Sequence, residues 1–368
     1  MKYFSQVHMI FLMIIVLAGC GSHSSSHNNE NPFDYTGLSR LTDPEENGYL
    51  LDSLPNDIEA ICDIANVQLV HYRMLSQWNI PKSKWHTAMA HHDIKDILDT
   101  LKIKSPGVLS ENRKLENRVV GACTKESIFL TSLLRNKGIP ARIRVGYFTN
   151  LYRADNAIEF WEKVNRYERE NQFDMDQWNS WTKHNIDVNR SIEHFVTEYW
   201  NKDSKKWEIL DARPEFLEYH GVKLDKKYHL KLNYNYEFAW QVWLKRDSIE
   251  EDAYAERGWS AKTHIRYQML LDFYSLLNHD GPAIFESNGI QTSADDPRRL
   301  FLEKDFDDLS KLEIEELDIL AKLLSHSPSV NELIEFYNSS RTLKIKSIEE
   351  DKYSFIYLHN LNTTTKNK

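Results

Sequence analysis

The chain has 368 residues, and its acidic side chains outnumber the basic ones, which gives a formal net charge of −9 with histidine neutral. An acidic chain without runs of Lys or Arg has no electrostatic reason to bind nucleic acid or anionic lipid headgroups. With 41% hydrophobic and 12% aromatic residues, the composition predicts a folded protein with one large or two modest hydrophobic cores.

The first residues are typical of a targeting segment. One charged side chain, Lys2, precedes a nearly unbroken apolar run at residues 9–17, which is too short to cross a bilayer as a helix. The four residues at 17–20, LAGC, resemble the lipobox of bacterial lipoproteins. This resemblance implies a signal peptide over residues 1–19, lipidation of Cys20 and a place in the bacterial cell envelope, outside the cytoplasm. An ordinary secretory signal cut nearby is the competing interpretation.

A polar tether over residues 20–50 is expected next, because it opens with the low-complexity run GSHSSSHNNEN. Helical spacing of apolar residues then predicts helices within residues 54–101. The stripes are Ile58, Ile61, Ala65, Leu69 and Tyr72, followed by Ile94, Ile97, Leu98 and Leu101. Cys62 falls on the first stripe and is interpreted as a core residue; a disulfide with Cys123 is the alternative.

Cys123 stands where another helical pattern begins. The apolar residues of residues 123–136 recur at helical spacing, and Gly138 followed by Pro140 is a helix stop signal. Cys123 is therefore placed at or within one turn of a helix N-terminus. There the partial positive charge of the backbone N–H groups favours thiolate over thiol.

Three strands follow in the pattern. Residues 142–147, 194–200 and 206–211 alternate with period two, and a turn separates the last two segments. Folding that hairpin about residues 202–203 brings Asp211 level with His194 to within about one residue, close enough for a cross-strand contact. The carboxylate would then orient the imidazole.

A thiol, an imidazole and a carboxylate in this order are the parts of a nucleophilic acyl-transfer site. Taken singly, each has a structural interpretation, since a lone cysteine on a helix is usually a small buried hydrophobe. The surrounding sequences carry more information. They read RVVGACTKESIFLTSLLRNKGIPARIRVGY at 118–147, EHFVTEYW at 193–200 and KWEILDAR at 206–213.

These segments resemble the transglutaminase-like superfamily, and in particular its bacterial transglutaminase-like domain proteins. The resemblance implies an α+β fold with a transglutaminase-like, papain-like core. The nucleophile would lie at a helix N-terminus packed on an antiparallel sheet, with helical N- and C-terminal segments around it. It also implies that Cys123, His194 and Asp211 form a catalytic triad.

The domain organisation follows from these assignments. A catalytic domain is expected over residues 51–235, with an insertion at about 150–190. Part of this long aromatic insertion is expected to be helical, at about 155–169. It would act as a lid or an aromatic wall for substrate, or be a packed surface excursion.

A mainly helical region is expected over residues 236–345, followed by a tail over 346–368. Ala239-Trp240, Asp272 and Leu277-Asn278 resemble features of the C-terminal part of the same bacterial family.

Histidines also cluster before one of the predicted helices, as His86, His91, His92 and Asp93. This arrangement is more typical of a helix N-terminal cap with exposed imidazoles than of a metal site, since no HExxH or CxxC spacing is present. Neither a metal nor a cofactor is expected.

The predicted activity is attack of the Cys123 thiolate on an amide carbonyl, with the oxyanion held by backbone N–H and His194 protonating the departing amine. The resulting thioester would pass to water, giving a peptidase or amidase, or to an amine, giving a crosslink. Location favours hydrolysis of a peptide or protein substrate of the cell envelope.

Two other classes remain. One is a lipid-anchored protein that keeps the fold to bind peptides without catalysis. The other is a papain-like wall endopeptidase, which is disfavoured because Asp211 lies on the strand directly after the histidine strand. The sequence leaves the oligomeric state open.

Overall fold

The structure is a computed structural model, in which the described residues are 32–78, 93–104, 109, 113–148, 162, 166, 191–213, 224, 226–233, 236–254, 259–279 and 304–366. The expected lipidation site Cys20 and the histidines at 86, 91 and 92 lie outside these residues, as does nearly all of the expected insertion. Within that insertion Glu162 and Arg166 are described, and both are helical, as predicted for this part of it.

A five-stranded sheet runs through the molecule in the order β6-β5-β4-β3-β7, and every pair of neighbouring strands is antiparallel. Its strands are β3 (Ala141–Phe148), β4 (Ile192–Asn201), β5 (Lys206–Leu210), β6 (His229–Leu230) and β7 (Tyr236–Phe238). The strands predicted over 142–147, 194–200 and 206–211 are thus confirmed. The sheet also takes a strand, β7, from just beyond residue 235.

A second, two-stranded sheet is parallel and joins β1 (Leu69–His71) to β2 (Val119–Gly121). It changes one prediction. The helix α1 (Ile58–Gln68) ends at Gln68, so Leu69 lies on a strand and Tyr72 in a short 3-10 helix. The predicted helical stripe was wrong at these two residues, because pairing with β2 draws the chain into extended backbone after Gln68.

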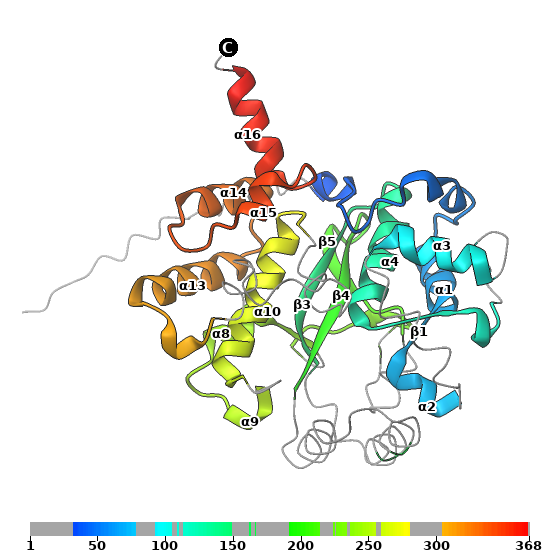
Figure 1. Ribbon diagram of the computed structural model, residues 1–368, viewed down its shortest axis with the longest axis horizontal. Coiled ribbons are helices and arrows are strands. Elements are labelled where there is room, and N and C mark those ends of the chain that lie inside the picture. Colours follow the sequence, from blue (N-terminus) through cyan, green and yellow to red (C-terminus); the bar gives the residue numbers. More distant parts are fainter. Residues whose placement is uncertain are drawn as a thin grey trace, which may run out of the picture.

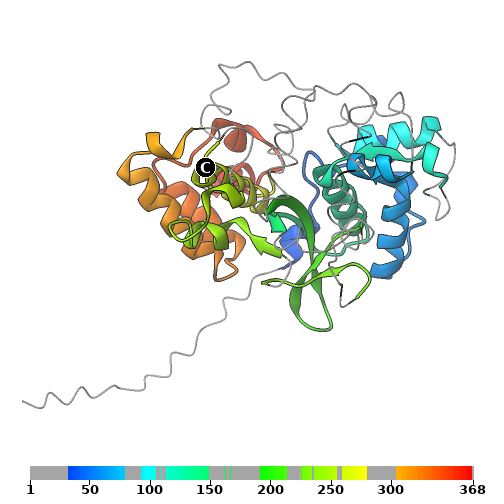
Figure 2. The ribbon, with the colours of Figure 1, turned by 90° about the horizontal axis from the view of Figure 1, so that it is seen from below.

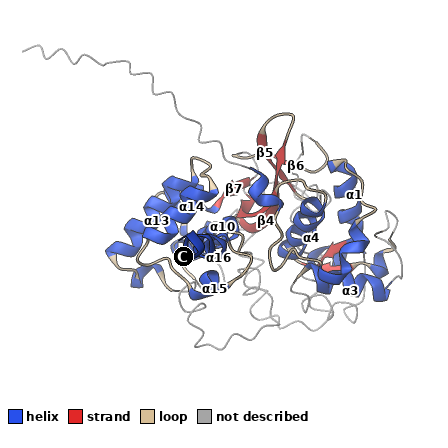
Figure 3. Ribbon diagram, turned by 90° about the horizontal axis from the view of Figure 1, so that it is seen from above, coloured by secondary structure: helices blue, strands red, loops and turns tan. Residues whose placement is uncertain are grey.

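Helices cover the sheet on two flanks, as Figures 1 and 3 show. One flank holds α1, α3 (Ile94–Lys104) and α4 (Cys123–Asn136). The other holds α8 (Ala239–Leu244), α10 (Ala261–Leu276), α13 (Lys311–Leu324) and α14 (Val330–Ser339). The view from below separates the same two groups (Figure 2).

The remaining helical elements are short, apart from the last. They are η1 (Pro32–Thr36), η2 (Glu45–Leu51), η3 (Tyr72–Met74), α2 (Leu75–Trp78), η5 (Leu115–Asn117), α9 (Glu251–Tyr254), η7 (Phe306–Asp308), α15 (Lys346–Glu350) and α16 (Phe355–Lys366). The expected C-terminal tail therefore contains two helices, and α16 projects from the body of the molecule (Figure 1). Among the helices that the structure describes, none has the length and apolar character to cross a membrane.

Helix α4 is buried over most of its length because it packs between the sheet and the helices of its own flank. Its Thr131 hydroxyl lies 3.1 Å from the hydroxyl of Thr197 on β4. The helix ends as predicted, since Gly138 has φ 70°, a conformation that only glycine adopts without strain.

The two flanks are tied together by polar side chains of the α10 region. Asp272 accepts hydrogen bonds from the Arg144 guanidinium and from the backbone N–H of Val145. Asn278 accepts from Arg135 on α4 and donates to the carbonyl oxygens of Leu38 and Tyr353. The aspartate and asparagine of the predicted C-terminal pattern therefore join this region to the sheet, to α4 and to the chain ends.

Candidate active site

The register of the β4–β5 hairpin differs from the predicted one. The strands pair from Asn201 opposite Lys206 to Thr197 opposite Leu210, which leaves a turn at residues 202–205. Continued by one residue, this register places Asp211 opposite Val196 rather than opposite His194. The predicted alignment was wrong by two residues, because the turn closes around Asn201, whose side-chain oxygen accepts from two backbone N–H groups.

The predicted contact between the two side chains is nevertheless confirmed. His194 Nε2 lies 2.6 Å from Asp211 Oδ2, and the two side chains are 3% and 4% exposed. The pair is diagonal across the two strands, a separation that a carboxylate and an imidazole can span. Because Asp211 occupies Nε2, the ring is held in one orientation with Nδ1 as its other nitrogen.

Two aromatic side chains fix His194 further. The Phe148 ring stacks on the imidazole with centroids 3.9 Å apart and an interplanar angle of 25°. The Tyr236 hydroxyl donates a hydrogen bond of 3.1 Å to the His194 carbonyl oxygen. Burial and the charge of Asp272 raise the pKa of Tyr236 well above its usual value, so this hydroxyl keeps its proton at neutral pH.

Gly146 makes this close packing possible. It pairs with His194 on one side and with Phe238 on the other. A Cβ atom at this position would lie 2.1 Å from the Glu237 carbonyl oxygen and 2.8 Å from the Tyr236 hydroxyl. Only glycine therefore lets β7 approach β3 closely enough to bring Tyr236 onto the histidine strand.

The second oxygen of Asp211 is held by Arg213. The Arg213 backbone N–H donates to Asp211 Oδ1 at 2.8 Å, and its Nη2 lies 3.5 Å from His194 Nε2. The same guanidinium forms an ion pair with Glu126 on α4. The His194–Asp211 pair is thereby connected to the first turns of the helix that begins at Cys123.

Cys123 is the first residue of α4 and is partly exposed. The N-cap residue, Ala122, has no side chain that could accept hydrogen bonds from the first turn, whereas Ser260, Ser310 and Ser329 cap α10, α13 and α14 in this way. The N-terminal charge of α4 therefore meets no side-chain cap at Ala122, which suits a thiolate or an oxyanion.

Strand β2 places this helix start beside the histidine strand. Val120 of β2 belongs to the same hydrophobic cluster as Phe148, Val196 and Tyr236, and Cys123 follows β2 directly along the chain. The helix start and the His194–Asp211 pair thus gather around the same end of β3, β4 and β7.

Residues 93–212 match the model of the Transglutaminase-like superfamily. No curated protein and no solved structure matches the chain. The transglutaminase-like domain contains α3, α4, β3, β4 and β5 together with Cys123, His194 and Asp211. Domains of this superfamily commonly occur in cysteine enzymes, which suggests a thiol enzyme here.

Sequence reasoning did not identify several residues around the predicted three. Arg213 and Glu126 stand next to predicted residues in the segments KWEILDAR and CTKES, but nothing local indicates that they meet. Only the strand pairing shows that Phe148, at the end of its strand, and Tyr236, on β7, lie near His194.

Other predictions concern cysteine and metal. Cys62 is fully buried, and neither Cys62 nor Cys123 is part of a disulfide. Burial and nearby carboxylates raise the pKa of the Cys62 thiol strongly, as befits a core residue. Asp93 caps α3 by accepting from the Asp96 N–H at 2.9 Å. Within the described part of the chain, no group of three or more His, Cys, Asp or Glu side chains could hold a metal.

Proposed function

We propose that this protein is a thiol enzyme that acts on amide bonds through Cys123, His194 and Asp211, and that it is anchored to a bacterial membrane through lipidated Cys20. The observation that carries the proposal is the 2.6 Å contact between His194 Nε2 and Asp211 Oδ2 beside the uncapped helix that begins at Cys123. A buried carboxylate on one nitrogen of an imidazole stabilises the imidazolium and aims the other nitrogen.

The chemistry assigns one role to each group. Cys123 as thiolate attacks the carbonyl carbon of an amide, and the backbone N–H groups at the start of α4 stabilise the oxyanion. The C–N bond then breaks, and His194 gives its proton to the departing amine. A thioester to Cys123 remains, and Asp211 holds the ring throughout.

The thioester is proposed to pass to water, so that the enzyme is a peptidase or amidase. This choice follows from the proposed place in the cell envelope, where water, wall peptides and envelope proteins meet the site. Transfer to a lysine-like amine is the competing second half-reaction, and it uses the same first step.

Labelling with iodoacetamide tests the first step without knowledge of the substrate. At pH 6 an ordinary thiol with a pKa of about 8.5 is less than about 1% thiolate. We expect Cys123 of the wild-type protein to label at least about tenfold faster than Cys123 of a His194→Ala variant, as measured by mass spectrometry of the Cys123 peptide.

His264→Ala is the matched control, because His264 is also a buried histidine bonded to a carboxylate, Glu193, but belongs to α10. In this variant Cys123 should be labelled at the wild-type rate. Slow labelling of the wild type that His194→Ala leaves unchanged would instead support a peptide-binding protein without catalysis.

A substrate screen tests the second step. The purified protein and its Cys123→Ser variant would be incubated with wall peptides and with glutamine-bearing proteins, with and without an added primary amine. Cleavage or deamidation that requires Cys123 supports hydrolysis, whereas amine incorporation supports acyl transfer. Mass spectrometry distinguishes the two products.

A further inference from the structure

We propose that Glu126 and Arg213 act as positioning residues: together they hold Asp211 on His194, tie both to the helix of Cys123, and balance the charge beside the imidazole. This inference rests on the function proposed above and concerns how its site is assembled. Neither residue is expected to touch substrate.

Arg213 holds one oxygen of Asp211. Its backbone N–H donates to Asp211 Oδ1 at 2.8 Å, and its side-chain Nε lies 3.8 Å from the same oxygen. Both contacts go to Oδ1, which leaves Oδ2 to His194. The carboxylate is therefore constrained on both oxygens, and its bond to the imidazole has a defined direction.

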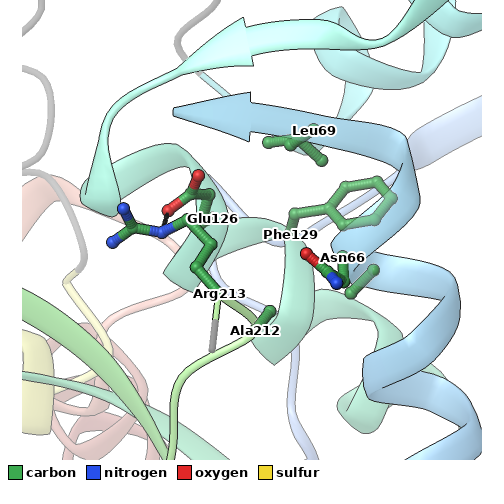
Figure 4. A pocket seen from close by; sticks show the side chains of 7 residues that line it. Asn66, Leu69, Glu126, Phe129, Ala212 and Arg213 are labelled. Carbon is green, nitrogen blue, oxygen red and sulfur yellow. Dashed lines mark ion pairs between the residues drawn. The ribbon is translucent and has the colours of Figure 1, made fainter. Parts of the chain in front are cut away.

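Glu126 links Arg213 to the helix that begins at Cys123. Glu126 lies one turn after Cys123 on α4, and its carboxylate pairs with the Arg213 guanidinium (Figure 4). The two side chains are 7% and 8% exposed. A buried ion pair with one partner on α4 and the other just after Asp211 fixes the helix relative to the histidine strand.

Arg213 also places a positive charge close to His194. Arg213 Nη2 lies 3.5 Å from His194 Nε2, so the guanidinium opposes a positive charge on the ring. Glu126 offsets that effect by pairing with the guanidinium. Without Glu126, the Arg213 guanidinium would draw more strongly on the Asp211 carboxylate, which also has to stabilise the imidazole.

A small pocket borders the ion pair. Its apolar lining is Ala65, Leu69, Phe129 and Ala212, and Asn66 completes it beside Glu126 and Arg213 (Figure 4). Because most of this wall is apolar, the two charges are poorly solvated there, and each influences its neighbours more strongly than it would in water.

Two variants that replace a charged side chain by a neutral amide test the charge argument, because they predict shifts of opposite sign. The readout is the rate of Cys123 labelling by iodoacetate against pH, because the imidazolium attracts this anionic reagent and the rate falls along a high-pH limb as the imidazolium is lost. Glu126→Gln removes one of the carboxylates that pair with the Arg213 guanidinium and should move this limb down by about 1 pH unit. Arg213→Gln removes the cation and should move it up by about the same amount.

Both variants keep the backbone N–H of residue 213, which donates to Asp211. The two variants can therefore be compared for the effect of the side-chain charges. The double variant Glu126→Gln/Arg213→Gln should return the limb to within about half a pH unit of the wild type. Arg246→Gln is the control, since Arg246 pairs with Asp318 among the C-terminal helices. It should leave the profile unchanged.

The outcomes separate this inference from the proposed function. A wild-type profile that does not depend on His194 would end the proposed function, and this inference with it. A His194-dependent profile that shifts in the same direction in both variants, or in neither, would overturn the positioning role alone. If Arg213→Gln does not fold, as judged by circular dichroism, the downward shift in Glu126→Gln decides the matter, and its absence contradicts the inference.

Discussion

Strand β4 carries two clusters of buried charge that differ in kind. The structural cluster joins Arg142, Arg144 and Glu198 to Asp272 of α10. The site cluster joins His194, Asp211, Arg213 and Glu126 of α4. Each cluster connects the sheet to a helix of a different flank, so β4 is linked to helices on both sides of the sheet.

In the structural cluster every charge has several partners. Arg144 donates to both oxygens of Asp272 and to Glu198, and Glu198 also accepts from Arg142. Burial would raise the pKa of Glu198, but the two guanidinium groups outweigh it and lower that pKa below its usual value. Glu198 therefore stays ionised at neutral pH.

The site cluster contains the imidazole ring of His194. It is held by one carboxylate oxygen and stacked on Phe148, and the partly exposed Cys123 begins the helix next to it. The structural cluster thus joins the sheet to α10, whereas the site cluster is the one to which the proposed function assigns chemistry.

The largest expected effect comes from breaking the structural cluster. Asp272→Asn leaves the Arg144 guanidinium short of its buried counter-charge, and we expect the free energy of unfolding to fall by about 3–5 kcal/mol. Denaturant unfolding followed by circular dichroism measures this loss. In the fraction that stays folded, the rate of Cys123 labelling should match that of the wild type.

Asp211→Asn is the matched variant in the site cluster, and it should show the reverse pattern. Its unfolding free energy should fall by about 1.5–3 kcal/mol, the range for one hydrogen bond to a charged group. Its Cys123 labelling at pH 6 should slow by at least about tenfold, because the imidazolium loses its carboxylate. Equal effects of the two variants on labelling would remove the distinction between the clusters.

A smaller effect is expected from Gly146→Ala. The added Cβ would meet backbone atoms of Glu237 and Phe238 as well as the Tyr236 hydroxyl, so β7 has to move. We expect a loss of about 1–3 kcal/mol, together with slower Cys123 labelling, because Tyr236 moves away from the His194 strand.

Gly37→Ala is the control for this substitution. Its Cβ would lie 3.6 Å from the Asp34 carbonyl oxygen, which is ordinary contact, so neither stability nor labelling should change by much. If Gly146→Ala retained wild-type labelling despite reduced stability, the contact of Tyr236 with the histidine strand would not matter for the site.

The features predicted from sequence are those that local pattern encodes. The helix that starts at Cys123, its stop at Gly138 and the three strands follow from periodicity and from turn residues. The contact of His194 with Asp211 was predicted despite a wrong register, because side chains two residues out of register on the same face can still meet.

The features that were missed depend on distant parts of the chain. Leu69 left the predicted helix because its strand pairs with Val119, fifty residues away. The ion pair of Glu126 with Arg213 forms only when the whole domain is folded, and no spacing of residues in the sequence predicts it. Long-range pairing of this kind decides which charged residues surround a site, and a single sequence does not display it.

The smallest expected effect concerns the acid dependence of stability. Glu198 has a pKa lowered in the folded protein, so the stability that it contributes is present above the usual carboxyl pKa and is lost as the pH falls through the lowered one. One such group changes the unfolding free energy by at most about 1.4 kcal/mol per pH unit.

Glu198→Gln removes this group while preserving its shape. Between pH 5 and pH 3, that is over roughly the range where carboxyl groups titrate, its unfolding free energy should therefore fall less steeply than that of the wild type, even though the variant starts from a lower value at pH 7. Denaturant unfolding at several pH values gives both slopes. Parallel slopes would mean that Glu198 takes up its proton equally in the folded and unfolded chain, and the two guanidinium groups would then not be holding it ionised.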